Sequence, residues 1–295
     1  MAFLLQLVVT GFAQGMVYAL AALGFVIVLK CSKAFNVAQG QFVMIGGYLG
    51  YTLLGMLHLP VWLSLIIAIA LAIVLGLVCE RLVLRPMVGK PVLAIIMVTM
   101  GLATILDAIA VFFWESQYLT YHGMLPTINL QVGEVSVPPE TLIAIMVSIV
   151  AVAILMIFFR YTRIGLVMRA TAEDEQVVQV AGINVTIVYA VSWVIAWVVG
   201  IIGGILLGGE GGVTIQMENV GLKVLAVVLL GGIDSVEGAV VAGIMLGMLE
   251  NIAAGYLDPM LPAGGLATVF PFIIMIIVLI FRPYGLFGLK RIERI

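Results

Sequence analysis

Apolar residues form eight long stretches along the chain, separated by shorter segments that hold most of its charged residues. A helix that crosses a bilayer needs about 20 apolar residues, at roughly 1.5 Å per residue, and most of the stretches approach that length. The stretches cover residues 3–29, 36–57, 61–79, 92–114, 141–159, 186–208, 223–256 and 267–281. The pattern predicts an all-α protein: a polytopic helix bundle embedded in the lipid bilayer, with about 8–10 transmembrane segments.

One stretch is too long for a single simple helix. Residues 223–256 contain the interruption GGIDSVEG at 231–238, which carries the acids Asp234 and Glu237. Glycines in an otherwise apolar run favour a break, so we expect a broken or re-entrant helix near 231–238. The chain then makes about nine crossings, or about seven with a re-entrant hairpin, and the sequence leaves both alternatives open.

The composition is that of a membrane protein with one domain. The chain is 64% hydrophobic and 9% charged, whereas soluble proteins average about 25% charged residues. The stretches leave room for a single transmembrane domain, residues 1–295, and for no soluble domain. We expect no nucleic-acid partner.

Basic residues are confined almost entirely to every second connection between the stretches. Connections on the cytoplasmic side of a membrane carry the excess of Lys and Arg. We therefore expect residues 160–185 and the C-terminus in the cytoplasm, and residues 115–140 and the N-terminus outside. Twelve of the 13 basic residues follow this alternation: Lys30, Lys33, Arg81, Arg85, Lys90, Arg160, Arg163, Arg169, Arg282, Lys290, Arg291 and Arg294.

Motifs of enzymes and of nucleotide sites are missing from the sequence. There is no G-x-x-x-x-G-K-[ST] phosphate loop, no H-E-x-x-H pair, no G-x-S-x-G elbow and no cluster of Cys and His. His58 and His122 stand alone in polar connections. We expect neither catalysis nor ATP hydrolysis by this chain, and no metal or cofactor.

Two acids, Asp107 and Glu250, lie within apolar stretches. An acid at membrane depth is costly, so each is either part of an ion relay or bonded to a neighbouring helix. A relay needs basic partners at similar depth, and no basic residue is recognised in the middle of a stretch. The structural alternative is therefore favoured.

Amides open the second apolar stretch, at residues 36–41. At the start of a broken helix, amides can bind a substrate or exposed backbone without burying a charge. We expect a substrate pathway between this segment and 231–238, although N-capping by Asn36 and a surface turn at 231–238 are simpler alternatives. The expected pathway residues are Asn36, Gln39, Gly40, Gln41, Gly231, Gly232, Asp234, Glu237 and Gly238.

Residues 160–185 are the charge-dense segment of the chain. Gly165 permits a turn, the following residues have helical spacing with Arg169 and Glu173 four apart, and Gly182 is a plausible helix stop. A helix that rests on lipid is basic on its polar face, but residues 173–175 are all acidic. The segment is expected to dock onto a cytoplasmic partner.

The pattern Gly-x-x-x-Arg-Ala-x-x-x-Asp, followed by Gly-Ile-Asn, resembles the coupling loop of branched-chain amino acid ABC-transporter permeases of the LivH type. GMVYALAALGFVIVLK, FNVAQGQFVMIGGY, LLGGIDSVEGAVVAGIMLGMLE and FRPYGLFG extend the resemblance over most of the chain. The family commonly has an acid where Gln41 stands here, so the substrate range can differ. The expected coupling residues are Gly165, Arg169, Ala170, Glu173, Asp174, Gly182, Ile183 and Asn184.

The resemblance implies an importer permease of the bacterial inner membrane that translocates branched-chain amino acids. It implies four kinds of contact: with a second homologous permease subunit, two cytoplasmic ATP-binding subunits, an extracytoplasmic substrate-binding protein and the amino-acid substrate. Closure of the ATP-binding subunits would pull on residues 165–184. Permeases for urea and short amides share much of the pattern, and other amino acids are possible substrates. A partner-independent carrier or channel and a membrane-embedded enzyme or assembly subunit are the remaining alternatives.

Overall fold

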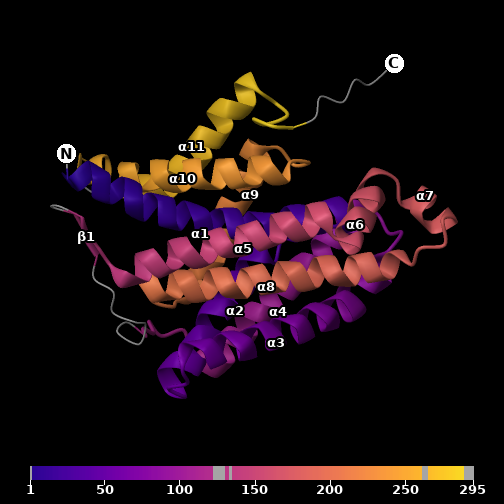
Figure 1. Cartoon of the computed structure of the whole chain (residues 1–295), viewed down its shortest axis with the longest axis horizontal. Coiled ribbons are helices and arrows are strands. Elements are labelled where there is room, and N and C mark those ends of the chain that lie inside the picture. Colours follow the sequence, from indigo (N-terminus) through magenta and orange to yellow (C-terminus); the bar gives the residue numbers. More distant parts are fainter. Residues whose placement is uncertain (1, 122–129, 133–134, 261–264, 289–295) are drawn as a thin grey trace.

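Long apolar helices make up most of the computed structural model, which describes residues 2–121, 130–132, 135–260 and 265–288 (Figure 1). Within these described residues, six helical segments are long and apolar enough to cross a membrane: α1 (Ala2–Ser32), α3 with its extension (Val61–Met87), α4 (Val92–Trp114), α5 (Pro139–Tyr161), α8 (Val185–Gly211) and α10 with its extension (Val236–Met260). The prediction of an all-α polytopic membrane bundle is confirmed.

Shorter elements complete the fold. The apolar ones are α2 (Gln39–Gly50), α9 (Val220–Gly231) and α11 (Leu266–Phe281). α2 continues as the π-helical turn η1 (Tyr51–Met56), and α3 (Val61–Cys79) continues through η2 (Glu80–Leu84) and η3 (Arg85–Met87). The remaining elements are α6 (Arg163–Glu173), α7 (Glu175–Val180), η4 (Ile215–Asn219), η5 (Asp258–Met260) and the antiparallel strands β1 (Leu130–Val132) and β2 (Val135–Val137).

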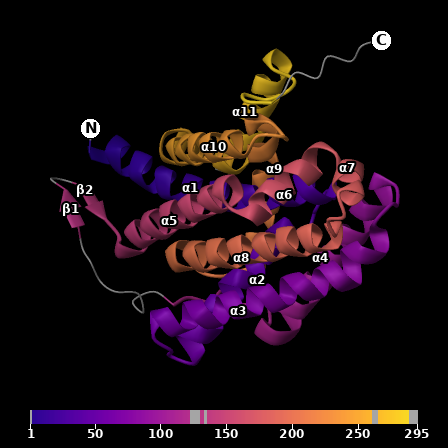
Figure 2. The same cartoon turned by 45° about the vertical axis from the view of Figure 1, so that its right-hand side comes forward.

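Helices α1 and α8 form the centre of the bundle. In two views α8 runs between α5 on one side and α3 and α4 on the other (Figures 1 and 2). Trp193 and Trp197 of α8 are fully buried, and the Trp197 ring stacks on Phe42 of α2 with 4.0 Å between centroids. The buried aromatic surface ties α2 to α8.

Connections that carry basic residues gather at one end of the bundle, which we call the basic end. There Lys30 Nζ donates to the Asp234 carbonyl (2.8 Å) and Lys33 Nζ donates to the Ala172 carbonyl (2.9 Å). The basic end lies at the right of Figure 1, with α6 and α7, and the N-terminus lies at the left. At the opposite end Leu119 pairs with Val213. The alternation along the chain therefore corresponds to a grouping in space.

The long stretch 223–256 is broken, as predicted, between α9 and α10. α9 ends at Gly231 and α10 begins at Val236, where the Ser235 hydroxyl accepts from Gly238 N (2.9 Å). The hydrogen bond from Lys30 places this break at the basic end. α9 has 12 residues, or about 18 Å, so residues 212–219 must supply the rest of the passage. This path corresponds to the nine-crossing alternative.

Irregular backbone does occur at depth, just before α2. Residues 33–38 lead from the end of α1 into the bundle, and the Gln39 amide donates to the Ala196 carbonyl of α8 (3.4 Å). Ala196 lies about 16 Å along α8 from its first residue. Thr99 of α4 supports the segment, because its hydroxyl donates to the Phe35 carbonyl (3.1 Å) and accepts from Val37 N (3.3 Å). Protein groups thus satisfy backbone that lipid could not.

Candidate functional site

A cavity of about 200 Å³, mainly apolar with a few polar groups, lies where the segment before α2 meets the start of α9. Asn36, Gln41 and Glu218 contribute polar groups to its lining, and Phe25 and Leu225 are among the apolar residues. A few polar groups within apolar walls are typical of small-molecule sites. We take this cavity as the candidate substrate site.

Two glycines allow the walls of the cavity to come together. A Cβ atom added to Gly221 would lie 2.8 Å from Gly40 N, and one added to Gly40 would overlap the Glu218 carbonyl oxygen. Real Cβ contacts are longer, so neither position accepts a side chain without a shift of backbone. Gly40 and Gly221 therefore set the approach of α2 to α9, and with it the position of Glu218.

The Gln41 amide is shared between two carboxylates. Gln41 Nε2 donates to Glu218 Oε2 (3.3 Å) and to Asp107 Oδ2 of α4 (3.5 Å). The other oxygen, Asp107 Oδ1, is buried and has no hydrogen-bond partner among the described residues. Glu218 was missed in the sequence because residues 209–222 fall between apolar stretches and read as an ordinary connection. The acid and amide of GGVTIQMEN are the signal that could have identified it.

The other amides of the second stretch are mainly structural. Asn36 Oδ1 accepts from Ala38 N (3.2 Å), and Asn36 Nδ2 donates to Gln39 Oε1 (3.3 Å). Asn36 thus holds the turn before α2 and lines the cavity, but it does not cap the helix as the simpler alternative had it, because the N-cap residue is Ala38 and no side chain caps it. Gln39 reaches the Ala196 carbonyl instead.

The structure does not bring residues 231–238 to this cavity. Gly221 lies against Gly40, whereas Gly231 is ten residues further along α9, about 15 Å away. Gly232 packs against Gly288 of the terminal segment, and Glu237 is exposed in the first turn of α10. The expected pairing of the two interruptions is thus replaced by a pairing of residues 36–41 with 218–221.

A buried ion pair lies deeper in the bundle, between α9 and α10. Lys223 Nζ is 2.5 Å from Glu250 Oε1, and the Tyr18 hydroxyl of α1 lies 3.1 Å from both Lys223 Nζ and Glu250 Oε2. Glu250 therefore has a basic partner that the sequence did not reveal. Lys223 opens its stretch in the sequence, but α9 begins inside the bundle and carries Lys223 with it.

The predicted coupling segment forms two short helices at the basic end, not one. Asp174 is extended (φ −149°, ψ 107°), and its carboxylate accepts from Gln176 N (2.9 Å) and Val177 N (3.2 Å), so that it ends α6 and caps α7. Gly182 (φ +78°) stops α7, as predicted. The Asn184 side chain caps α8 by accepting from Thr186 N (3.0 Å).

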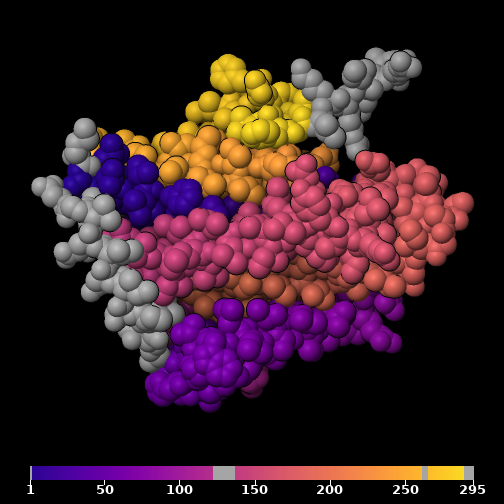
Figure 3. Space-filling model, in the orientation of Figure 1, coloured from indigo at the N-terminus to yellow at the C-terminus, as the bar shows by residue number. Residues whose placement is uncertain are grey.

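One face of the predicted coupling segment packs against the rest of the protein, and the other face is exposed. The Arg169 guanidinium donates to the Phe159 carbonyl at the end of α5, and not to Glu173. Gly165 packs against the same turn of α5, where a Cβ would overlap backbone oxygens. Met168 and Val178 are buried, while Ala170, Glu173, Ile183 and Asn184 are exposed. In Figure 3 the α6–α7 region projects at the right of the molecule.

An open groove of about 590 Å³ borders α7. Arg85 from η3 lies on one wall, and Glu175, Gln179 and Asn184 lie on the other. Together with the exposed residues of α6 and α7, it forms a polar surface at the basic end. We call this the coupling surface.

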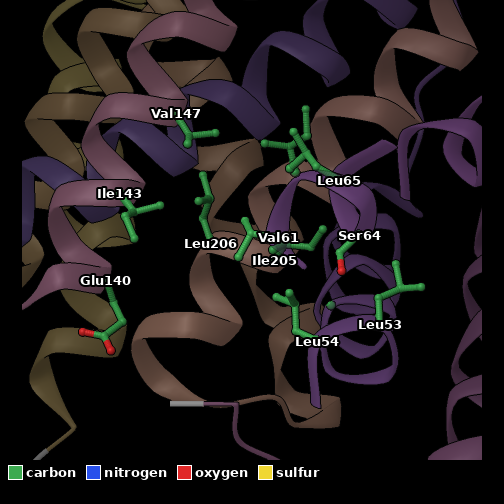
Figure 4. Close-up of a pocket in the computed structure, with 12 residues that line it drawn as sticks. Leu53, Leu54, Val61, Ser64, Leu65, Glu140, Ile143, Val147, Ile205 and Leu206 are labelled. Carbon is green, nitrogen blue, oxygen red and sulfur yellow. The ribbon is translucent and has the colours of Figure 1, made fainter. Parts of the chain in front are cut away.

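A second interior pocket, near the opposite end, is almost entirely apolar. It measures about 60 Å³ and lies among η1, α3, α5 and α8, with Ser64 and Glu140 as its polar residues (Figure 4). Its size and lining make it a weaker candidate for a polar substrate than the cavity beside Gln41. Across the described residues, no group of three His, Cys, Asp or Glu side chains could hold a metal ion.

Comparison with known proteins identifies a family. Residues 7–279 match the family described as branched-chain amino acid transport system / permease component. The chain is 30% identical to the high-affinity branched-chain amino acid transport system permease protein BraD of Pseudomonas aeruginosa, over 99% of this chain and 98% of the relative.

Two further relatives are similar to the chain over most of its length. The chain is 28% identical to the high-affinity branched-chain amino acid transport system permease protein LivH of Escherichia coli K12, over 99% of this chain and 98% of the relative. A probable branched-chain amino acid transport permease protein LivH of Methanocaldococcus jannaschii is 26% identical to the chain, over 94% of this chain and 90% of the relative. No solved structure matches.

Proposed function

The chain belongs to the branched-chain amino acid transport system permease family, and from this premise we propose that it is the membrane-spanning subunit of an ATP-driven importer for branched-chain amino acids. A permease component is a transport subunit and not an enzyme. The protein is a multi-pass membrane protein, and we place it in the inner membrane, with the basic end in the cytoplasm and the N-terminus outside. This orientation follows the rule for Lys and Arg in short loops.

The observation that carries the proposal is the family match over residues 7–279, which includes both the cavity beside Gln41 and the coupling surface. The cavity combines amide and carboxylate groups with apolar walls, as an amino acid with an aliphatic side chain requires. Gln41, Asn36, Gly40 and Glu218 are assigned to the substrate path. Residues 231–238 are assigned to the connection at the basic end.

The coupling surface is proposed to receive one of two cytoplasmic ATP-binding subunits. Its exposed side chains are polar and acidic around a few apolar ones, among them Val180, which is 89% exposed. Such a mixture suits a protein partner better than anionic lipid. The complete importer would also contain a second homologous permease subunit and an extracytoplasmic substrate-binding protein.

Reconstitution of the complete importer in proteoliposomes tests the proposal. With ATP and the loaded binding protein, labelled leucine, isoleucine and valine should accumulate, and a variant of the ATP-binding subunit that cannot hydrolyse ATP should abolish uptake. Import of urea or a short amide, without any branched-chain amino acid, would contradict the substrate assignment.

A partner-independent carrier is the second candidate, and the Lys223–Glu250 pair is the observation in its favour. Carriers use paired charges at membrane depth as ion relays. In this chain the two charges and Tyr18 satisfy one another, which suits a structural role equally well. Uptake by the permease alone, driven by a proton or sodium gradient without ATP, would favour the carrier.

A further inference from the structure

We propose that the inner end of α9, together with the segment that follows α11, forms a second docking site for the ATP-binding subunit, beside the coupling surface. This inference rests on the proposed function and adds a contact that α6 and α7 do not provide. We call the site the terminal clasp. It consists of residues 229–235 and 282–288, which include most of the two sequence patterns GGIDSVEG and FRPYGLFG.

The two segments of the terminal clasp are joined through their backbones. Leu286 N donates to the Leu230 carbonyl (2.8 Å), and Phe287 N donates to the Gly231 carbonyl (3.0 Å). Both carbonyls belong to the last turn of α9, where the helix itself offers them no partner. The terminal segment therefore completes the end of α9, the helix whose other end carries Gly221 to the cavity.

Glycines allow the two segments to approach this closely. Gly232 (φ +105°) and Gly285 (φ +77°) have left-handed backbone that other residues rarely adopt. A Cβ on Gly232 would lie 2.5 Å from Gly288 N, and one on Gly285 would lie 2.7 Å from Gly232 N. The two sequence patterns thus build one fixed surface.

A pocket of about 180 Å³ lies between the two segments. Leu229, Ile233 and Tyr284 line it, with the acid Asp234 among them. Ile233 and Tyr284 are 43% and 50% exposed, and Phe287 is also 50% exposed. Apolar and aromatic side chains that stay exposed around a hollow are typical of a site that receives a side chain of a partner protein.

The position of the terminal clasp identifies the partner. Lys30 Nζ donates to the Asp234 carbonyl of the clasp, and Lys33 Nζ donates to the Ala172 carbonyl of α6. The two lysines are three residues apart at the end of α1, so the terminal clasp and the coupling segment are reached from the same place. A subunit that covers the coupling surface therefore has the terminal clasp as its next contact at the basic end.

A lipid surface fits this site less well than a protein does. Residues 232–235 and 282–288 are not helical, so their backbone groups belong outside the hydrocarbon region. Asp234 in the pocket and Glu237 on the adjoining turn of α10 carry the charge that an anionic leaflet repels. The expected occupant of the pocket is an apolar side chain of the ATP-binding subunit.

Photo-cross-linking in the complete importer provides the first test. Ile233→Cys and Tyr284→Cys, labelled with a maleimide that carries a photoreactive group, should each form a product with the ATP-binding subunit. Val180→Cys, on exposed α7, tests the coupling surface in the same way. Ile280→Cys is the matched control, because Ile280 is 72% exposed on α11, two residues before the clasp, and should give no product with that subunit. Cys31 and Cys79 are buried.

Dissociation of the ATP-binding subunit from the purified importer provides the second test. Ile233→Ser and Tyr284→Ser remove exposed side chains and keep the glycines and backbone hydrogen bonds of the clasp. Each should speed dissociation after dilution at least about fivefold, as expected for side chains that anchor an interface. Ile280→Ser should dissociate at the parental rate.

The outcomes separate this inference from the proposed function. Cross-linking from Val180→Cys without any from Ile233→Cys or Tyr284→Cys overturns the second docking site and leaves the importer function standing. Parental dissociation in both clasp variants, or products of Ile233→Cys and Tyr284→Cys with lipid or a permease subunit alone, also overturns it. Failure of Val180→Cys to reach the ATP-binding subunit contradicts the coupling surface of the proposed function instead.

Discussion

At the scale of single residues, the bundle depends on polar groups that are satisfied by partners from distant parts of the chain. Glu250 is 7% exposed and is bound by Lys223 and by Tyr18. A buried ion pair contributes little compared with well-packed apolar residues, but removal of one partner leaves an uncompensated charge. The pair therefore fixes how α9, α10 and α1 fit together more than it adds stability.

Glu250→Leu should destabilise the purified permease by about 3 kcal/mol, because Lys223 is left unpaired in the bundle. Adding Lys223→Met to the same chain should recover most of the loss. Thermal unfolding in detergent, followed for both variants and the parent, measures the effect. A double variant as unstable as the single one would show that the charges are not coupled.

Gly40→Ala and Gly221→Ala should each reduce transport severely, since either Cβ would meet backbone of the facing segment and push Glu218 away from Gln41. Gly101→Ala is the matched control, because a Cβ there meets nothing within 4 Å and alanine favours a helix by up to about 1 kcal/mol. Uptake of labelled leucine compares the three. If both the Gly40 and the Gly221 variants transport leucine at the parental rate, transport does not require the close approach of α2 to α9.

At the scale of elements, the coupling segment shows how one side chain divides a predicted helix. The helical spacing continues through residues 166–182, yet Asp174 leaves the helix to cap the next turn. The Asp side chain competes for backbone N–H groups, which is why it favours caps over helix interiors. Thr162 begins α6 in the same way, by accepting from Gly165 N (3.0 Å).

Ala170→Pro should uncouple the importer. Ala170 is exposed in the interior of α6, where proline removes a backbone donor and costs about 3 kcal/mol or more. Arg163→Pro is the control, because Arg163 is the first helical residue and proline is tolerated there. ATP hydrolysis stimulated by the binding protein should be lost in the first variant and kept in the second. Stimulated hydrolysis in Ala170→Pro equal to that of the parent would exclude α6 as the contact.

At the scale of the whole molecule, the helices that connect the two ends of the bundle differ in how much of their surface is buried. α1 and α8 are enclosed by other helices, whereas α3, α4 and α5 expose most of their surface. Exposed apolar helices suit contact with lipid or with another permease subunit. The irregular segment 212–219 includes η4, which packs against α2, α9 and α4, so other helices surround it where lipid could not satisfy its backbone.

Orientation in the membrane can be measured with single cysteines. Gln117→Cys in the exposed connection after α4 should react with an impermeant thiol reagent on intact cells, and Gln176→Cys on α7 should react only after permeabilisation. Cys31 and Cys79 are buried and should give little background. The reverse pattern of labelling would mean that the basic end faces outward.

Hydropathy along the chain was sufficient to predict most of the architecture. The stretch 61–79 coincides with α3, 92–114 coincides with α4, and a break divides the last long stretch as expected. These features follow from local rules, because a bilayer requires continuous apolar helices and every backbone group must be bonded within the protein. The spacing of Lys and Arg likewise predicted which connections share an end.

Tertiary structure alone decided which interrupted segments face each other. Residues 36–41 and 231–238 are both polar interruptions of apolar stretches in the sequence. In the structure, Lys30 holds residues 231–238 at the basic end. The close approach of Gly221 to Gly40 brings Glu218, and not residues 231–238, to Gln41. Lys223 meets Glu250 for the same reason, since the depth at which α9 begins is set by packing against α2 and not by its own residues. Contacts between residues more than 60 positions apart leave no periodicity in a single chain, so the membership of the cavity could not be read from it.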